Sequence, residues 1–282
     1  MDLKNEEYEF ERLNGNNMSD LVLLYKNTFN TSASAEFFKK KFNTSHIGIS
    51  HIGFLAYAKD KTPAAFYGVF PCWIEYKGNT ILAAQSGDTM TDPKHQGKGL
   101  FTRLAKMTYE LAEKEGIKLV FGFPNKNSYP GFTKKLNWIH RHNIRTYNFK
   151  INTLPLIKAA KKFNTSELYG NYAKALLKKY FSTAACFPNS SIDPEHAGVV
   201  HDRAFCLYKG YSKNFILKLD NDVSLWVKLD GKLWIGDVDR TPSENFITAL
   251  RKLQRLCFFL GCSEITFNIS PDSYWDRILS KK

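Results

Sequence analysis

The 282-residue sequence has no long apolar run, and this absence excludes a membrane-spanning helix as its main feature. No uninterrupted hydrophobic stretch approaches the roughly 20 residues that such a helix requires. The sequence also has no run of five or more charges of one sign, which disfavours a basic or acidic interaction tail. Hydrophobic residues make up 43% of the chain, enough to build a folded core, so a disordered protein is excluded as well.

Cysteine is scarce, and its five positions are widely scattered: Cys72, Cys186, Cys206, Cys257 and Cys262. No CxxC pair occurs, so neither a zinc ribbon nor a redox dithiol is supported, and we expect no metal site. Cys257 and Cys262 flank an apolar stretch and are most simply small buried residues. The pattern is typical of a reducing compartment, and we expect a cytoplasmic protein.

Acidic residues are outnumbered, with 27 Asp and Glu against 40 Lys and Arg, for a net charge of +13. Such an excess suggests an anionic partner, which could be nucleic acid, a phosphate-bearing cofactor or an acidic surface. A lysine-rich surface that only keeps the protein soluble explains the excess equally well. Because the cations form no basic tail, nucleic acid is the weakest of these partners.

The spacing of apolar residues predicts an α/β protein with one unit over residues 1–151 and another over 152–282. In the first unit we expect strands at 8–13, 53–59, 64–76, 80–91, 117–123 and 138–151. The expected helices of that unit lie at 21–29, 34–42, 100–115 and 129–136. The segment 117–123 is nearly all apolar, which favours a strand that is buried on both faces.

The last third of the chain repeats this order on a smaller scale. A hairpin, a strand over 232–238, a helix over 244–260 and a strand over 264–269 follow one another. Gly236-Asp237 stands where Gly87-Asp88 stands in the first unit. We interpret the second unit as a degenerate repeat that keeps the scaffold, against the alternative that any α/β chain yields such a coincidence.

The segment from Gly87 to Leu104 is predicted to form a strand, a glycine turn and a helix. The first turn of a helix carries unpaired backbone N–H groups and the positive end of the helix dipole. Gly97 and Gly99 would let the chain curl so that these donors converge on an anion, and Lys98 adds a mobile positive charge. The segment therefore suits a phosphate or a pyrophosphate.

Two common phosphate motifs do not fit this segment. A nucleotide-triphosphate loop needs GxxxxGK[ST], whereas Leu100 follows Gly99 here. A dinucleotide fingerprint needs a third glycine where this sequence has Thr102.

Residues Gln96 to Phe101 resemble the acyl-CoA signature R/Q-x-x-G-x-G/A of the GCN5-related N-acetyltransferases (GNAT). The order of elements over roughly residues 7–150 is similar to that family too. The resemblance implies a GNAT fold, with a mixed, mostly antiparallel central sheet and flanking helices, followed by a smaller α/β domain. Phe101 departs from the signature, and its ring either faces the other side of the helix or narrows the pyrophosphate cradle.

This resemblance implies that acetyl-CoA is the co-substrate and that no metal is needed. The strand backbone at Thr89, Met90 and Thr91 would pair with the pantetheine arm. Asn125 takes the place of the family's asparagine beside that arm. The pyrophosphate would be held by the N–H groups of Gln96, Gly97, Lys98, Gly99, Leu100, Phe101 and Thr102.

The family's direct attack of an amine on the thioester needs a base, and we expect Asp88 to serve. The alternative is that Asp88 is a strand-edge carboxylate bonded to backbone. Asp92 is better interpreted as a turn former, His95 as a solvent-facing loop histidine and His140 as part of an exposed polar stretch.

The family's usual acid is a tyrosine, but the corresponding position here is Thr133. Tyr129 is the substitute candidate, although it could be a packing aromatic before Pro130. The acid is also dispensable in principle, because a thiolate leaves readily.

Together these features predict an N-acetyltransferase that acts on the primary amine of a small molecule. The resemblance is to bacterial members with a long C-terminal extension, which are often assigned to amino-sugar or surface-polysaccharide pathways, so an amino sugar or a nucleotide-linked amino sugar is the expected acceptor. The alternatives are a peptide or protein N-acyltransferase, a catalytically inactive CoA-binding scaffold and a nucleic-acid binder. We expect no nucleic-acid partner, no membrane span, and a monomer or homodimer.

Overall fold

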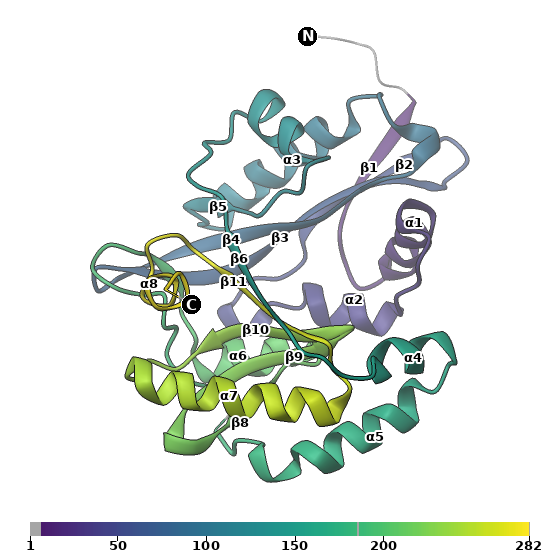
Figure 1. Cartoon of the computed structure of the whole chain (residues 1–282). Coiled ribbons are helices and arrows are strands. Elements are labelled where there is room, and N and C mark those ends of the chain that lie inside the picture. The colour runs from purple at the N-terminus through teal and green to yellow at the C-terminus, as the bar shows by residue number, and fades with distance from the viewer. Residues whose placement is uncertain (1–6, 185, 282) are drawn as a thin grey trace. The chain divides into compact units, whose positions relative to one another are not determined.

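The computed structural model describes residues 7–184 and 186–281, and it divides into two compact units after Arg141 (Figure 1). The division falls earlier in the chain than the expected boundary at residue 151. It also makes the second unit as long as the first, so the expectation of a smaller second domain is wrong.

The first unit contains a mixed, mostly antiparallel sheet, as the resemblance to the GNAT family implied, and its strand order is β1-β2-β3-β4-β5. All neighbours in this order are antiparallel except β4 and β5, which are parallel. The strands are β1 (Tyr8–Arg12), β2 (Ile52–Ala58), β3 (Pro63–Tyr76), β4 (Asn79–Thr91) and β5 (Leu119–Phe121). The helices are α1 (Met18–Phe29), α2 (Ala35–Phe42) and α3 (Leu100–Lys114).

Helices cover both faces of this sheet (Figure 1). Leu100 and Leu104 of α3 are four residues apart, so both face the sheet, where they pack in one core with Tyr67. On the opposite face, Phe38 and Phe42 of α2 have the same spacing and pack against Phe66. The alternation of Phe66 and Tyr67 along β3 thus sends one ring to each core.

The strand β5 is shorter and more exposed than its apolar sequence predicts. Leu119 is 45% exposed and Phe123, just beyond the strand, is 64% exposed. The prediction of a strand buried on both faces is therefore wrong; among the described residues β5 pairs with β4 alone, at the end of this strand order. The short helix expected at 129–136 is present at residues 129–135, and its last five residues, Gly131–Lys135, form a π-helical turn.

The second unit has its own sheet in the order β6-β11-β10-β9-β8. The strands of this sheet are β6 (Arg145–Lys150), β8 (Phe215–Lys218), β9 (Ser224–Asp230), β10 (Lys232–Val238) and β11 (Glu264–Ile269). The two-residue strand β7 (Gly198–Val199) is not part of this sheet. The helices of this unit are α4 (Leu156–Lys162), α5 (Ser166–Leu177), α6 (Arg203–Lys209), α7 (Ser243–Leu260) and α8 (Tyr274–Leu279).

The strand that we expected to close the first unit belongs to the second sheet. β6 pairs antiparallel with β11, from Arg145 opposite Ile269 to Lys150 opposite Glu264. Residue alternation indicates that a segment is extended, but it does not identify the partner strand. Because β6 belongs to the second sheet, the boundary between the units falls before β6 and not after it.

The two sheets share one detail of register. In the first, β4 pairs with β5 at three positions only, 83–85 with 119–121. In the second, β10 pairs with β11 at three positions only, 233–235 with 265–267. In each sheet the antiparallel register also shifts just after these positions, near Gly87 and at Gly236. This correspondence supports our interpretation of the second unit as a degenerate repeat.

Candidate active site

Among the described residues, no strand pairs with the β5-facing edge of β4 beyond the short parallel ladder, so this edge is open. β5 reaches only as far as Gln85, whereas β4 continues to Thr91 while still paired with β3. In an extended strand the backbone N–H and C=O groups point alternately to its two sides. Some of these groups between Ser86 and Thr91 therefore face away from β3. Thr89, Met90 and Thr91, the predicted pantetheine partners, lie in this open segment.

The glycine turn lies between β4 and α3, as predicted. Gly97 and Gly99 have φ values of +77° and +75°, which a residue with a side chain adopts only with strain. A Cβ built on either glycine would meet nothing within 4 Å. Glycine is therefore required here by the backbone conformation, and the space outside the turn is open to a ligand.

The N-terminus of α3 is uncapped within the described residues. Gly99 is the N-cap, it supplies no side chain, and α3 runs for 15 residues behind it. The N–H groups of its first turn therefore combine with the positive end of a long helix dipole. This arrangement suits the two negative phosphates of a diphosphate.

Lys98 and His95 both interact with residues at the start of the sheet. The ammonium of Lys98 lies 2.9 Å from Glu7, and this ion pair holds the pKa of the Glu7 carboxyl below its usual range. His95 shares a hydrogen bond of 2.8 Å with the hydroxyl of Tyr8, at its ring nitrogen Nδ1. His95 is therefore a packing partner of β1, and the interpretation as a solvent-facing loop residue is wrong.

Phe101 leaves the turn open. Its ring contacts Tyr67 and Phe132 edge-on, with centroid distances of 5.8 and 5.3 Å. These contacts place the ring in the core between α3 and the sheet. Of the two alternatives that the sequence left for Phe101, the structure selects the one that does not narrow the cradle.

Asp88 lies at the register shift of β4 and has a φ of +55°. Its carboxylate is 2.5 Å from the ammonium of Lys41 in α2, and both side chains are largely buried. A non-glycine residue in the left-handed region costs on the order of 1 kcal/mol or more, and such residues are concentrated at functional sites. The carboxylate is thus held in one place by an ion pair that the sequence did not reveal.

Asp92 behaves as the turn former that its position before Pro93 predicts. Its carboxylate accepts hydrogen bonds from the backbone of Lys94 and from the side chain of Asn27, each at 2.9 Å.

Asn125 and Tyr129 follow β5 within one short turn. The Asn125 side-chain oxygen accepts hydrogen bonds from the N–H groups of Asn127 and Ser128, at 2.9 and 3.0 Å. Tyr129 is 38% exposed, and its ring lies edge-on to His140 with centroids 5.6 Å apart. The amide of Asn125 therefore shapes the turn that presents the Tyr129 phenol.

A buried chain of hydroxyl groups escaped the sequence analysis. The Tyr67 hydroxyl is bonded to Ser86 at 2.8 Å and to Tyr109 at 2.7 Å, and Trp138 donates to Tyr109 at 3.0 Å. Burial raises the pKa of the Tyr67 phenol far above its usual value. The chain joins β3, β4 and α3 beneath the open edge, and the signal in the sequence was a tyrosine within an otherwise apolar strand.

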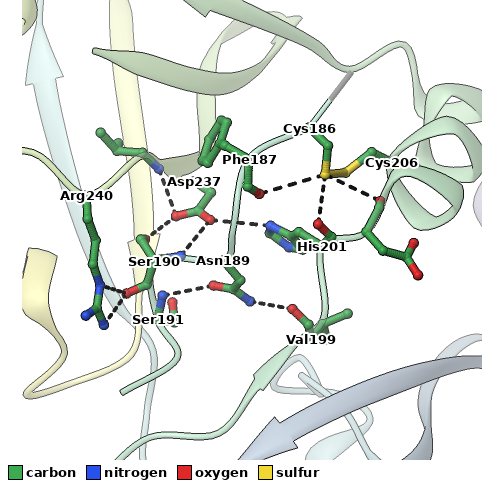
Figure 2. A network of polar contacts seen from close by, with 12 residues as sticks. Cys186, Phe187, Asn189, Ser190, Ser191, Val199, His201, Cys206, Asp237 and Arg240 are labelled. Atoms are coloured by element: carbon green, nitrogen blue, oxygen red, sulfur yellow. Dashed lines mark hydrogen bonds and ion pairs between the residues drawn. A yellow bond between two sulfur atoms is a disulfide. The ribbon is translucent and has the colours of Figure 1, made fainter. Parts of the chain in front are cut away.

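The position in the second unit that corresponds to Asp88 is occupied by Asp237, but its surroundings differ (Figure 2). Its carboxylate accepts hydrogen bonds from the N–H of Ser190 at 3.1 Å, from the N–H of Val238 at 2.8 Å and from the Ser190 hydroxyl. His201 Nδ1 lies 3.5 Å away. Arg240 donates to the Ser190 carbonyl, so the network connects segments of this unit.

The same region contains a disulfide between Cys186 and Cys206 (Figure 2). The sequence did not indicate this bond, because it joins residues that are 20 positions apart and that only folding brings together. Cys257 and Cys262 are free and fully buried, as predicted.

The pKa values of His201 and Asp237 are shifted in opposite directions, and this predicts how the stability of the protein depends on pH. Burial raises the pKa of Asp237 to about 6 and lowers that of His201 to about 4. The Asp237 contribution to stability is present below pH 4 and lost as the pH rises to 6. The His201 contribution is present above pH 6.5 and lost as the pH falls to 4.

We therefore expect the two contributions to offset each other between pH 4 and 6. Asp237→Asn should make stability fall more steeply toward pH 4 than in the wild type, and His201→Gln should make it rise. Urea unfolding of the three proteins at pH 4, 5 and 6 measures these slopes. Identical slopes in all three proteins would contradict the assignment.

Comparison with models of known protein families gives a match over the first unit. Residues 9–140 match the family model of the acetyltransferase (GNAT) domain. This match covers just under half of the chain, and it identifies residues 9–140 as similar to a GNAT acetyltransferase domain. Enzymes of this family take an acyl group from acyl-CoA. Among curated proteins, none matches the sequence.

Solved structures show that the likeness in fold extends through the second unit. A GCN5-related N-acetyltransferase from Kribbella flavida is 13% identical, with a TM-score of 0.56 over 95% of this chain; the chain spans 65% of that protein. A candidate acetyltransferase from Pyrococcus horikoshii is 18% identical, with a TM-score of 0.54 over 99% of this chain and 86% of that one. N-myristoyltransferase of Saccharomyces cerevisiae, with bound myristoyl-CoA and inhibitors, is 10% identical, with a TM-score of 0.58 over 96% of this chain and 76% of that one.

The described residues contain neither a helix that could span a membrane nor a cluster of side chains that could bind a metal ion. No helix there is long and apolar enough to cross a membrane. No group of three or more His, Cys, Asp or Glu side chains there could hold a metal ion.

Gly99→Val tests the glycine turn. The substitution forces a branched side chain into a left-handed backbone and into the space outside the turn, so we expect acetyl-CoA affinity to fall at least about tenfold. Gly78→Val is a matched control, since Gly78 has the same φ of +75° and open surroundings in the β3–β4 hairpin. Calorimetric titration with acetyl-CoA measures the difference, and equal affinities in the two variants would contradict the role of the turn.

Proposed function

We propose that the protein transfers an acetyl group from acetyl-CoA to the primary amine of a small molecule, such as an amino sugar or a nucleotide-linked amino sugar. The observation that carries this proposal is the uncapped start of α3 after Gly97 and Gly99, next to the open edge of β4. These features suit the two ends of one ligand, a diphosphate and an amide-containing arm. Acetyl-CoA has both.

The residues that we assign to acetyl-CoA fall into two groups. Thr89, Met90 and Thr91 would offer backbone groups to the pantetheine amides, as an added strand would. The N–H groups around the turn would hold the diphosphate: Gln96, Gly97, Lys98, Gly99, Leu100, Phe101 and Thr102. Asn125 would stand beside the arm.

The proposed reaction is a direct attack in a ternary complex. The amine nitrogen attacks the thioester carbonyl carbon, the carbon–sulfur bond breaks, and an amide and the free thiol of CoA result. Asp88 would accept the proton that the ammonium must lose, directly or through water, and Tyr129 would donate a proton to the leaving thiolate. Lys41 keeps the Asp88 carboxylate in position for this role.

The experiment that tests the function is a free-thiol release assay with acetyl-CoA and a panel of amines. The panel contains amino-sugar phosphates, nucleotide-linked amino sugars, amino acids and short peptides. We expect amine-dependent thiol release with an amino sugar. Release at the rate of hydrolysis for every amine, together with intact CoA binding, would instead favour the inactive scaffold.

A peptide acceptor is the second candidate. It is favoured by the likeness in fold to N-myristoyltransferase, which covers both units of this chain. In the same assay, release with short peptides and not with amino sugars would select this candidate.

A further inference from the structure

The second unit contains a pocket of about 390 Å³ that the acyl-transfer chemistry does not use. This volume is within the usual range for a small-molecule site. Trp226 and Lys228 of β9, Trp234 of β10 and Asn268 of β11 contribute from the sheet. The alternate residues of these strands are buried in the core under α7, so the pocket lies on the opposite face.

The other wall of the pocket comes from α6 and the residues on either side of it. His201, Phe205 and Lys209 contribute side chains from this segment. The ring of Phe205 stacks on His201 with centroids 5.5 Å apart, and both rings meet Trp226 edge-on, at 6.1 and 4.9 Å. The pocket thus has a fixed cluster of aromatic rings, which favours a ligand with a flat ring.

The charged groups in the lining are all cations. Lys209 and Lys228 line the pocket, and no Asp or Glu does so among the described residues. His201 adds no charge near neutral pH, because burial lowers its pKa to about 4. A ligand with a negative group is therefore favoured over a neutral or cationic one.

The α6 wall is fixed before any ligand binds. Asp202 caps α6 by accepting the N–H of Phe205 at 2.7 Å, and the disulfide from Cys206 ties the same helix to Cys186 (Figure 2). His201 is further held near Asp237. A pocket with preset walls loses little conformational entropy when it binds a ligand.

We propose that this pocket binds a small organic phosphate with a flat ring, of the nucleoside monophosphate type. The ring would contact Trp226 and Phe205, and the phosphate would be held by Lys209 and Lys228. The site shares no residue with the glycine turn. The proposal therefore goes beyond the acyl transfer and does not rest on it.

Titration of the full chain with uridine 5′-monophosphate tests the proposal, followed by calorimetry and by tryptophan fluorescence. Each titration is done without CoA and again with saturating CoA, so that binding of the nucleotide at the turn before α3 is recognised. We expect binding with quenching of tryptophan emission. Uridine, which lacks the anion, and inorganic phosphate, which lacks the ring, should each bind at least about tenfold more weakly.

Variants locate the site. Lys209→Gln should weaken binding of the nucleotide at least about tenfold. Lys174→Gln removes the same charge from the exposed surface of α5 in the same unit and should leave it unchanged. Trp226→Leu should abolish the quenching, and thermal unfolding checks that each variant is folded.

Three results would overturn the proposal. The first is no binding of the nucleotide at millimolar concentration to the folded wild-type protein. The second is equal loss in Lys209→Gln and Lys174→Gln, which would indicate a general effect of charge. The third is binding that CoA abolishes, which would place the nucleotide at the α3 turn.

Discussion

Asp88→Asn should lower kcat for acetyl transfer by about 10²–10⁴-fold, the range that general base catalysis contributes. Asparagine has the same shape and tolerates the left-handed backbone of this position, so the register shift of β4 should persist. What it lacks is the ability to accept the proton of the ammonium. Acetyl-CoA affinity should be unchanged, because Asp88 contributes nothing to the turn at α3.

The ion pair with Lys41 provides the control for this prediction. If Asp88 only anchors α2, then Lys41→Met breaks the same pair and should impair kcat as much as Asp88→Asn. If Asp88 is the base, Lys41→Met leaves the carboxylate in place and should retain most of kcat. The kcat values of the three proteins separate the two roles, and an unchanged rate in Asp88→Asn would remove the assignment.

Asp276→Ala should cost about 3 kcal/mol of unfolding free energy in the second unit, because it removes a buried carboxylate that several groups share. Asp276 is 1% exposed and accepts hydrogen bonds from Tyr147 at 2.7 Å, from Arg145 at 2.6 Å and from the N–H of Asp272 at 2.8 Å. Tyr147 and Arg145 belong to β6, whereas Asp276 belongs to α8. The carboxylate therefore fastens the strand that enters this unit to the last helix.

Asp230→Ala is the matched control in the same unit. Its carboxylate pairs with Lys161 at 2.5 Å, but both side chains are about half exposed. Exposed pairs contribute about 0–1 kcal/mol, so this variant should be nearly as stable as the wild type. Urea unfolding followed by tryptophan fluorescence gives both values, and equal losses would show that burial of Asp276 does not matter.

The turn and the helix of the candidate site could be predicted because their signals are local. The glycine turn depends on backbone angles within a few residues, and the start of α3 depends on the apolar spacing that follows it. Both are present where the sequence predicts them, at Gly97, Gly99 and Leu100. A strand after α3 was also predicted, although its predicted burial on both faces was wrong.

Other features could not be predicted because they join distant parts of the chain. Lys41 meets Asp88 across 47 positions of sequence, since α2 packs on the face of the sheet where β4 changes register. The orientation of Phe101 was open for the same reason, because the rings that receive it come from β3 and from the turn at 131–135.

The sequence by itself determined that this is an α/β protein with a glycine turn before a helix, because turn conformation and helix periodicity are encoded within a few neighbouring residues. Only the tertiary structure decided that β6 joins the second sheet, that Cys186 bonds Cys206 and that a cationic aromatic pocket forms beside α6. Each of these depends on which surfaces pack together, and packing is chosen by the burial of the whole unit rather than by any one segment.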